Sequence, residues 1–337
     1  MTTETGLRDV GVSRITVDSG NASALSITQT HSMFRSTDGG DHWMQYEPQI
    51  NGSNISLIPA RSARSGTLYG GTTEVADSTF HTSSFNLYRT RDGGETWTGP
   101  LFTSVGYYDV TEVLEGHPGG TTIYLVGTNG RDAYGFATPY LYRSDDDGAH
   151  WIGALGGGFL PAQYGDTAAV QQAAIDPRDD LTIYAATNSG LYLSTDGAVH
   201  WSHIGVDPAQ PFPVATSGFG WITSFQIDPS HSDILYASWN NNAASPNFGV
   251  YKSINRGTTW FTINQGLPTL SITALVLDRN DLSTLYAGTP ANGVWITNDG
   301  GQHWTSLGAL PTPSSMVVND VALDPVQGRT IYVDTQA

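Results

Sequence analysis

One short stretch decides the fold: residues 144–151 read SDDDGAHW. The pattern within it, Ser/Thr-x-Asp-x-Gly-x-x-Trp, recurs six times, and we call each copy a box. The complete copies occupy residues 36–43, 90–97, 144–151 and 297–304. The altered copies occupy residues 194–201, with Ala198 in the glycine place, and 253–260, with Asn255 in the aspartate place. Successive box tryptophans lie 44 to 59 residues apart, an interval typical of repeat architectures.

Each residue type in the box suits a tight hairpin turn. Glycine tolerates the positive φ that such a turn needs, and the Asp and Ser/Thr side chains can hydrogen-bond to turn amides. The tryptophan covers the hairpin with a large apolar surface. We therefore predict structural roles for Asp38, Trp43, Asp92, Trp97, Asp146, Trp151, Asp196, Trp201, Asn255, Trp260, Asp299 and Trp304. The same role is predicted for His42, His150, His200 and His303, each of which precedes a box tryptophan.

The sequence around the boxes repeats as well. Upstream of each box runs a strand with an aromatic residue, and before that a short apolar strand, which carries a tyrosine in most repeats. An earlier strand ends in an acidic turn, eight residues before the tyrosine in four repeats, as at Asp176 and Tyr184. This pattern predicts an all-β protein whose repeat has four strands, A, B, C and D, with the box joining C to D. The predicted repeats span residues 8–50, 51–104, 105–158, 166–206, 219–267, 270–309 and, in part, 317–337, within a single domain of residues 1–337.

These boxes closely resemble the Asp-box (BNR) repeats of sialidases, xyloglucanase-type glycoside hydrolases and sortilin-type receptors, over nearly the whole chain. The resemblance implies a β-propeller of four-stranded blades. Strands A and B are predicted seven times and the C–D hairpin six times. Because closing a ring removes exposed sheet edges, we expect seven blades, the last of them incomplete. A sequence cut from a longer array is the alternative.

The composition limits the partners. Asp and Glu number 31 against 14 Lys and Arg, so no broad basic surface is available for nucleic acids or anionic membranes. Cysteine is absent, and no apolar run reaches the length of a membrane span. No cofactor or metal is predicted, because the three aspartates at 145–147 lie in a turn and lack calcium-loop spacing. An extracellular or periplasmic location is expected, although no signal peptide is visible at residues 1–6.

Long loops gather on one predicted face. These are the B–C loops 72–86, 128–140 and 239–249 and the D–A loops 155–167 and 205–220. Loops of this length in a compact domain are often functional, and these are rich in aromatic residues. We predict ligand binding by Trp221, Trp239, Tyr134, Arg131 and Asp132, because flat rings suit the CH-rich faces of sugars. The alternative is that the rings pack the loops against each other.

The resemblance to xyloglucanase-type enzymes implies two carboxyl groups flanking the scissile bond. Candidates on the loop face are Asp77, Asp109, Glu112, Asp132, Asp166, Asp207 and Asp320. We predict catalytic roles for Glu112, Asp109 and Asp166. If Glu115 takes the acidic-turn place, Glu112 occupies a strand-A position filled elsewhere by Ile15, Ala173, Phe225, Leu275 and Val321. A carboxyl group there suits a general acid, whereas a shift of one residue would turn it outward as a solvated strand acid.

Two departures bear on activity. Sialidases grip a carboxylate with three arginines, but most arginines here lie away from the loop face and the Arg-Ile-Pro signature is missing. Xyloglucanase-type enzymes carry an Asp after a Tyr-Ala-Arg-Thr strand and form their cleft between two propellers, whereas this sequence has Asn188 in that place and one propeller. The leading hypothesis is a carbohydrate-recognising propeller of glycoside-hydrolase type that hydrolyses a neutral β-glucan or a similar polysaccharide. The alternative is a non-catalytic, extracytoplasmic protein-binding scaffold.

Overall fold

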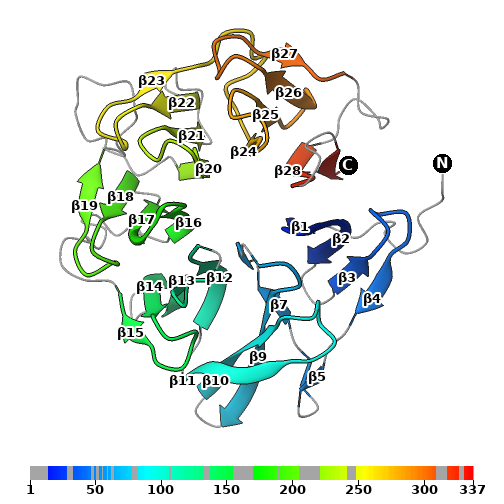
Figure 1. Ribbon diagram of the computed structural model, residues 1–337, viewed down its shortest axis with the longest axis vertical. Helices are drawn as coiled ribbons and strands as arrows, with labels where there is room; N and C mark the ends of the chain where they lie inside the picture. The colour runs from blue at the N-terminus through cyan, green and yellow to red at the C-terminus, as the bar shows by residue number, and fades with distance from the viewer. Residues whose placement is uncertain are drawn as a thin grey trace. The chain divides into compact units, whose positions relative to one another are not determined.

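The computed structural model describes most of the chain, and the regular structure in the described part is all β-strand (Figure 1). The described residues are 14–28, 33–46, 49–50, 53–54, 56–58, 60–61, 64–77, 82–105, 108–117, 119–131, 137–154, 170–187, 190–204, 221–240, 248–308, 317–325 and 330–336. Contacts divide the chain into two compact units. They are Met1–Gly153 with Asp324–Gln327, and Ala154–Leu323 with Gly328–Ala337.

The first unit holds three large sheets and a small hairpin. The first sheet has the order β1 (Arg14–Asp18), β2 (Asn21–Thr28), β3 (Met33–Ser36), β4 (Met44–Tyr46). The second has the order β7 (Ser56–Ile58), β9 (Leu68–Asp77), β10 (Thr82–Thr90), β11 (Thr98–Val105). The third has the order β8 (Ala60–Arg61), β12 (Tyr108–Glu115), β13 (Ile123–Arg131), β14 (Ala137–Ser144), β15 (Ile152–Gly153), in which β8 pairs parallel to β12. The small hairpin joins β5 (Gln49–Ile50) to β6 (Ser53–Asn54).

The second unit holds three four-stranded sheets and one two-stranded sheet. The first has the order β16 (Val170–Asp176), β17 (Asp179–Thr187), β18 (Gly190–Ser194), β19 (Ser202–Ile204). The second has the order β20 (Trp221–Ile227), β21 (Leu235–Asn240), β22 (Gly249–Ser253), β23 (Phe261–Thr262). The third has the order β24 (Ala274–Leu277), β25 (Leu285–Gly288), β26 (Val294–Thr297), β27 (Thr305–Ser306). The two-stranded sheet pairs β28 (Val317–Leu323) with β29 (Ile331–Gln336).

Six sheets thus contain the predicted order A, B, C, D, and we call them blades 1 to 6 in chain order. The prediction of four-stranded blades is confirmed. The predicted count of seven is wrong: the described chain forms six blades, and the last repeat is a separate two-stranded sheet, because residues 317–336 supply only an A and a B strand. Within the second unit the A strands β16, β20, β24 and β28 contact one another in chain order.

The core lies between consecutive sheets. Side chains alternate between the two faces of a strand, and consecutive residues are buried in the middle of the strands β13, β17, β21 and β25, so both faces of these B strands are covered. Val113 and Leu125 of blade 3 pack against blade 2, and Phe225 of blade 5 packs against blade 4. Leu275 of blade 6 packs against blade 5, and Val321 of the two-stranded sheet packs against blade 6. Each sheet therefore depends on its neighbour for burial, as expected of a repeat protein.

Each box closes its turn with the predicted side chains. The box Ser or Thr oxygen accepts a hydrogen bond of 2.8–3.1 Å from the amide of the glycine place. The box Asp, or Asn255, accepts one of 2.8–3.0 Å from the amide of the residue before the tryptophan. The four box histidines lie with Nδ1 2.6–2.8 Å from the second carboxylate oxygen. The histidines therefore cap the aspartates, a role that their position alone did not specify.

The box tryptophans also join neighbouring blades. Trp151 Nε1 donates to the carbonyl of Leu101 in blade 2 (2.7 Å), and Trp304 Nε1 donates to that of Ile263 in blade 5 (2.6 Å). In every box, the amide before the glycine place donates to a carbonyl at or beside the start of strand B in the same blade. These pairs are Gly39 with Ser23, Gly93 with Gly66, Asp147 with Thr121, Gly197 with Leu181, Arg256 with Asp233, and Gly300 with Ser283. One turn thus fixes both its own blade and the contact with the blade before it.

Candidate functional site

Glu112 lies one register position away from the place that the sequence predicted. It pairs with Val126, two residues after the strand-B tyrosine Tyr124, whereas Val113 pairs with Leu125. Val113 therefore takes the position of Ala173 and the other apolar residues. Gly116, not Glu115, takes the acidic-turn place: its amide donates to the Thr122 carbonyl, as Asp228 donates to Ile234. The difference arises at the turn, because the eight-residue spacing to Tyr124 leads to Gly116 and not to Glu115. The bulge between Val110 and Glu112 precedes Glu112, and a bulge occurs at the same place in blades 4 and 5.

The position that Glu112 occupies is polar or small in most repeats. Its equivalents by register are Arg14, Gln172, Ser224, Ala274 and Asp320. Gln172 bridges to blade 5, where its Oε1 accepts from the Phe225 amide (2.8 Å) and its Nε2 donates to the Phe225 carbonyl (3.1 Å). Ser224 donates to the Leu275 carbonyl of blade 6 (2.9 Å). This position therefore braces one A strand against the next in the two blades where the contact is described.

Glu112 is buried, with 2% of its surface exposed, so the alternative of a solvated strand acid does not hold. The bulge keeps Glu112 and Asp109 on one face of β12, because their partners Val126 and Thr128 are two residues apart on β13. Arg131 is the last residue of β13, two residues after Asn129, which pairs with Tyr108 of β12. Asp132, Tyr134 and Asp166 lie outside the described residues. Two of the predicted catalytic carboxyl residues thus share a strand and a face.

The two tryptophans predicted to bind ligand lie in blade 5 but do not form a pair. Trp221 begins β20 opposite Asn240, whereas Trp239 lies opposite Ile222. Trp239 is 2% exposed and packs in the core between blades 4 and 5, next to Phe248. A ring enclosed in this way offers no face to a sugar, so the packing alternative describes Trp239. Its place three residues after Tyr236 matches that of Thr187 after Tyr184, which is also buried.

Blades 2 and 3 carry longer B–C hairpins than the other described blades. Strand β9 continues eight residues past Tyr69 and β13 continues seven past Tyr124, whereas β17 continues three past Tyr184. Strand β11 is eight residues long, whereas the other D strands have two or three. In the first unit, the strands of two successive blades therefore extend further toward the loop ends, and Asp109 and Arg131 lie on strands β12 and β13 of the second of these blades.

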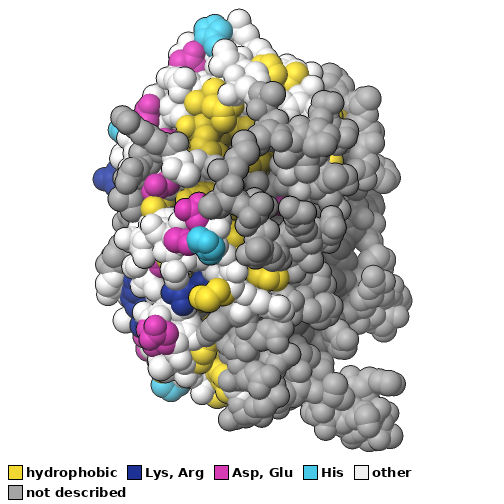
Figure 2. Space-filling model, turned by 90° about the vertical axis from the view of Figure 1, so that its right-hand side faces the viewer, with side chains coloured by type: hydrophobic (Ala, Val, Ile, Leu, Met, Phe, Trp, Pro, Cys, Tyr) yellow, Lys and Arg dark blue, Asp and Glu magenta, His cyan; other side chains and the backbone are white. Residues whose placement is uncertain are grey.

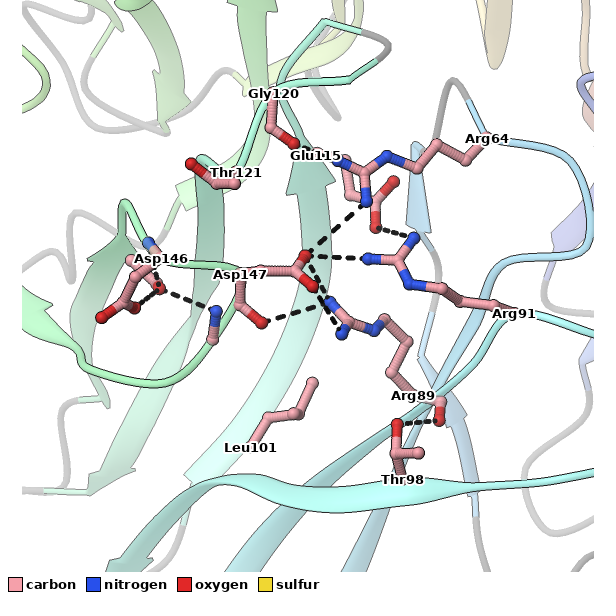
Figure 3. A network of polar contacts seen from close by, with 12 residues as sticks. Arg64, Arg89, Arg91, Thr98, Leu101, Glu115, Gly120, Thr121, Asp146 and Asp147 are labelled. Atoms are coloured by element: carbon pink, nitrogen blue, oxygen red, sulfur yellow. Dashed lines mark hydrogen bonds and ion pairs between the residues drawn. The ribbon is translucent and has the colours of Figure 1, made fainter.

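A second polar centre, missed from the sequence, lies at the box ends of blades 2 and 3 (Figure 3). Glu115 stands where other repeats have apolar residues such as Ile175 and Leu277, and its side chain is 4% exposed. It accepts a 2.6 Å hydrogen bond from the Tyr69 hydroxyl and lies 3.9 Å from Arg91. Burial, and then the Glu115 carboxylate, raises the pKa of Tyr69 well above its usual range. The signal was available: counting eight residues back from Tyr124 gives Gly116.

Three arginines converge on Asp147 in the same centre (Figure 3). Arg89 binds both carboxylate oxygens, at 2.8 and 2.9 Å, Arg91 binds one at 2.8 Å, and Arg64 lies 3.6 Å away. Burial raises the pKa of Asp147, but the bonds from Arg89 outweigh it and lower the pKa overall. Asp147 has a φ of 61°, where four other boxes have glycine. The ion pairs offset the strain of this left-handed backbone and fasten blade 3 to blade 2.

A third group of carboxyl residues lies on the two-stranded sheet. Asp320, a predicted loop-face candidate, is paired by register with Asp334, which is 6% exposed and receives a 3.2 Å hydrogen bond from Asn319. Burial, with a smaller effect of Asp320, raises the pKa of Asp334. Asp334 therefore keeps its proton to a higher pH than an ordinary aspartate. Sequence reasoning missed it because it lies on a B strand, where no carboxyl group was sought.

The described residues contain no group of three or more His, Asp or Glu that could hold a metal ion. On the described part of the face in Figure 2, the Lys and Arg side chains are scattered and form no continuous basic surface. No helix long and apolar enough to cross a membrane occurs in the described chain.

Comparisons with known proteins point to one class of enzyme and one fold. No protein-family model matches the sequence. A xyloglucanase of Paenibacillus sp is 28% identical over 198 residues, which cover 53% of this chain and 17% of the xyloglucanase. An ancestral GH74 enzyme of known structure superposes with a TM-score of 0.67 at 15% identity, covering 97% of this chain and 44% of that one. YCF48 bound to D1 peptide gives a TM-score of 0.61 at 12% identity, covering 97% and 91%.

These likenesses establish the fold. The chain is an all-β propeller with four-stranded blades. Its sequence is similar to that of xyloglucanases, and it spans less than half the length of the GH74 enzyme.

Proposed function

We propose that the chain is a carbohydrate-recognising propeller of glycoside-hydrolase type, and that its ligand is a neutral β-glucan or a similar polysaccharide. The observation that carries the proposal is the sequence similarity to xyloglucanases, since the fold alone does not define an activity. The net charge of −17 supports it, because such a surface repels polyanions and leaves neutral polymers unaffected. The boxes belong, in this proposal, to the Asp-box (BNR) class.

The proposed catalytic residues are Glu112, Asp109 and Asp166. Glycoside hydrolysis needs one carboxyl group to protonate the leaving oxygen and a second to activate water or attack the sugar. We assign the acid role to Glu112, a carboxyl residue in the middle of the A strand of blade 3. Asp109 on the same face, or Asp166, would be the second group.

One substitution distinguishes a catalytic role of Glu112 from a structural role in which it holds one A strand against the next. Glu112→Gln introduces the residue that blade 4 has at the same register position, Gln172, and so keeps the ability to hydrogen-bond to a neighbouring strand. The expected result is loss of at least about 100-fold in β-glucan hydrolysis with an unchanged thermal midpoint. Hydrolysis equal to that of the parent protein would remove Glu112 from the mechanism. Asp109→Asn and Asp166→Asn are tested in the same assay.

We propose that Trp221, Arg131, Asp132 and Tyr134 contact the polysaccharide. Trp239 is no longer part of this proposal, because its ring lies in the core. The test is binding of soluble xyloglucan to Trp221→Ala and to the parent protein. A polymer of this size is met outside the cytoplasm, so an extracellular or periplasmic location is part of the proposal, and fractionation of the source cells tests it.

A second candidate function is a non-catalytic, extracytoplasmic protein-binding scaffold. It is favoured by the match in length to the YCF48 structure, which holds a bound peptide and of which this chain covers 91%. Glycan binding separates the two candidates. A parent protein that binds no β-glucan but retains a polypeptide from its source would support the scaffold.

A further inference from the structure

A row of polar side chains crosses three strands of blade 2. Asn86 on β10 pairs by register with Thr72 on β9 and with Thr103 on β11. The Thr103 hydroxyl is on an exposed residue and donates to Asn86 Oδ1 (2.9 Å), while Asn86 is largely buried. Thr72 is 2% exposed, and its hydroxyl has no hydrogen-bond partner. The row thus runs from the exposed edge strand to an unsatisfied hydroxyl in the interior.

The corresponding threonines of other blades are satisfied. Thr187 in blade 4 and Thr289 in blade 6 also stand three residues after the strand-B tyrosine. Their hydroxyls donate to the carbonyls of Gly190 (2.9 Å) and Gly293 (2.8 Å), where the short hairpins turn. In blade 2 the hairpin continues, and Asn86 stands in the place of that glycine. In the long hairpin of blade 2, the side chain of Asn86 therefore stands opposite Thr72, the turn carbonyl that accepts the threonine hydroxyl in blades 4 and 6 has no counterpart, and the Thr72 hydroxyl makes no hydrogen bond.

We propose that this row, Thr72–Asn86–Thr103, binds a neutral sugar unit of the polysaccharide ligand. Thr103 and Asn86 would contact the sugar. A sugar hydroxyl oxygen would accept hydrogen bonds from the Thr103 hydroxyl and from Asn86 Nδ2. Asn86 Oδ1 is then released to accept from Thr72, which is a positioning residue. Binding would in this way satisfy a buried polar group that is costly to leave unpaired. The inference rests on the function proposed above and names a subsite for it.

The chemistry of the row fits a sugar better than a peptide. Its three side chains are uncharged, and each can exchange hydrogen bonds with hydroxyl groups, which act both as donors and as acceptors. An extended peptide added to the edge of β11 would pair with main-chain groups and would not need the buried side chains of the row. Loss of binding on removal of the Thr72 hydroxyl therefore argues for the sugar.

The test uses Thr72→Val and its matched control Thr289→Val. Each substitution removes one buried hydroxyl and keeps the shape of the side chain. Thr72→Val should leave the thermal midpoint of the ligand-free protein unchanged or higher, whereas Thr289→Val should lower it. Affinity for soluble xyloglucan, measured by calorimetry, should fall about three- to tenfold in Thr72→Val and stay at the parent value in Thr289→Val. Thr103→Val, at an exposed position, should weaken binding to a similar extent.

The outcomes are separable. Xyloglucan binding by the parent protein that is unaffected by Thr72→Val and Thr103→Val would overturn the subsite and leave the proposed function in place. A parent protein that binds neither xyloglucan nor mixed-linkage β-glucan would overturn both. A peptide that binds the parent protein and both valine variants equally would assign the edge of β11, not the row, to a protein partner.

Discussion

Replacing Glu115 by leucine restores the residue class of the repeat and should nevertheless destabilise the protein. At the same register position, Ile175 and Leu277 are apolar, so the substitution makes blade 3 more regular. It also removes the acceptor of the Tyr69 hydroxyl, which is fully buried and 2.6 Å from the Glu115 carboxylate. A buried hydroxyl left without its acceptor costs about 1–3 kcal/mol. Loss of the partly exposed Arg91 pair adds less than about 1 kcal/mol.

The expected loss for Glu115→Leu is therefore about 2 kcal/mol, after allowing for the apolar surface that leucine buries. Adding Tyr69→Phe removes the orphaned hydroxyl, so the double variant should recover about 1 kcal/mol of that loss. Urea unfolding followed by both tryptophan fluorescence and circular dichroism gives the free energy of unfolding, provided that the two transitions coincide. Ile175→Leu in blade 4 is the matched control and should cost less than about 1.5 kcal/mol.

The double-mutant cycle decides whether the reasoning is right. A coupling energy of about 1 kcal/mol between Glu115 and Tyr69 is expected of a buried charge-assisted hydrogen bond. A Glu115→Leu variant as stable as the parent protein, or additive effects of the two substitutions, would refute it.

Three further predictions concern the boxes. The hydrogen bond from the His42 amide, and then that from its ring, lowers the pKa of Asp38 to about 2. Since the pKa of Asp38 is lower in the folded than in the unfolded protein, the ionised carboxylate stabilises the fold above the unfolded pKa, and this stabilisation is lost as the pH falls toward 2. Between pH 5 and pH 2 the thermal midpoint should therefore fall less in Asp38→Asn than in the parent protein. Ala198→Gly should raise the free energy of unfolding, measured in urea, by about 1 kcal/mol, because Ala198 has a φ of 70°, a left-handed conformation that is strained for residues other than glycine. Ser144→Ala should lower it by about 1–2 kcal/mol, because the Gly148 amide loses its acceptor.

The sequence predicted the boxes and the strand order well, because both depend on short-range chemistry. The turn at residues 144–151 needs only its own side chains and a few backbone groups of its blade, so its pattern can be recognised in six repeats even where one residue differs. The loop ends were harder. Which face of β12 Glu112 occupies depends on whether Glu115 or Gly116 takes the acidic-turn place, and the acidic residue type favoured the wrong one of these two neighbours.

Trp239 shows a second limit of sequence reasoning. A tryptophan outside the repeat pattern suggested a ligand contact, but its register position, three residues past Tyr236, is interior in blades 4 and 6 as well, at Thr187 and Thr289. An interior position accepts any side chain that the surrounding core can hold, and here a cluster with residues from blades 4 and 5 includes Trp239. Residue type alone therefore misled, whereas register would have placed the ring correctly.

Two neighbouring positions in the middle of strand A have different roles: one is apolar and packs in the core, and the other varies in residue type. The position of Val113 faces the preceding sheet and is apolar in each repeat where it is described. The next position toward the loop ends, that of Glu112, faces the following sheet in the cases of Gln172 and Ser224, and bonds there to backbone groups. Backbone acceptors and donors do not change with sequence, so this position can hold an amide, a hydroxyl or a carboxyl group without loss of the fold. A carboxyl group at such a position can acquire a chemical role while its blade remains intact, and the Glu112→Gln experiment examines this separation directly.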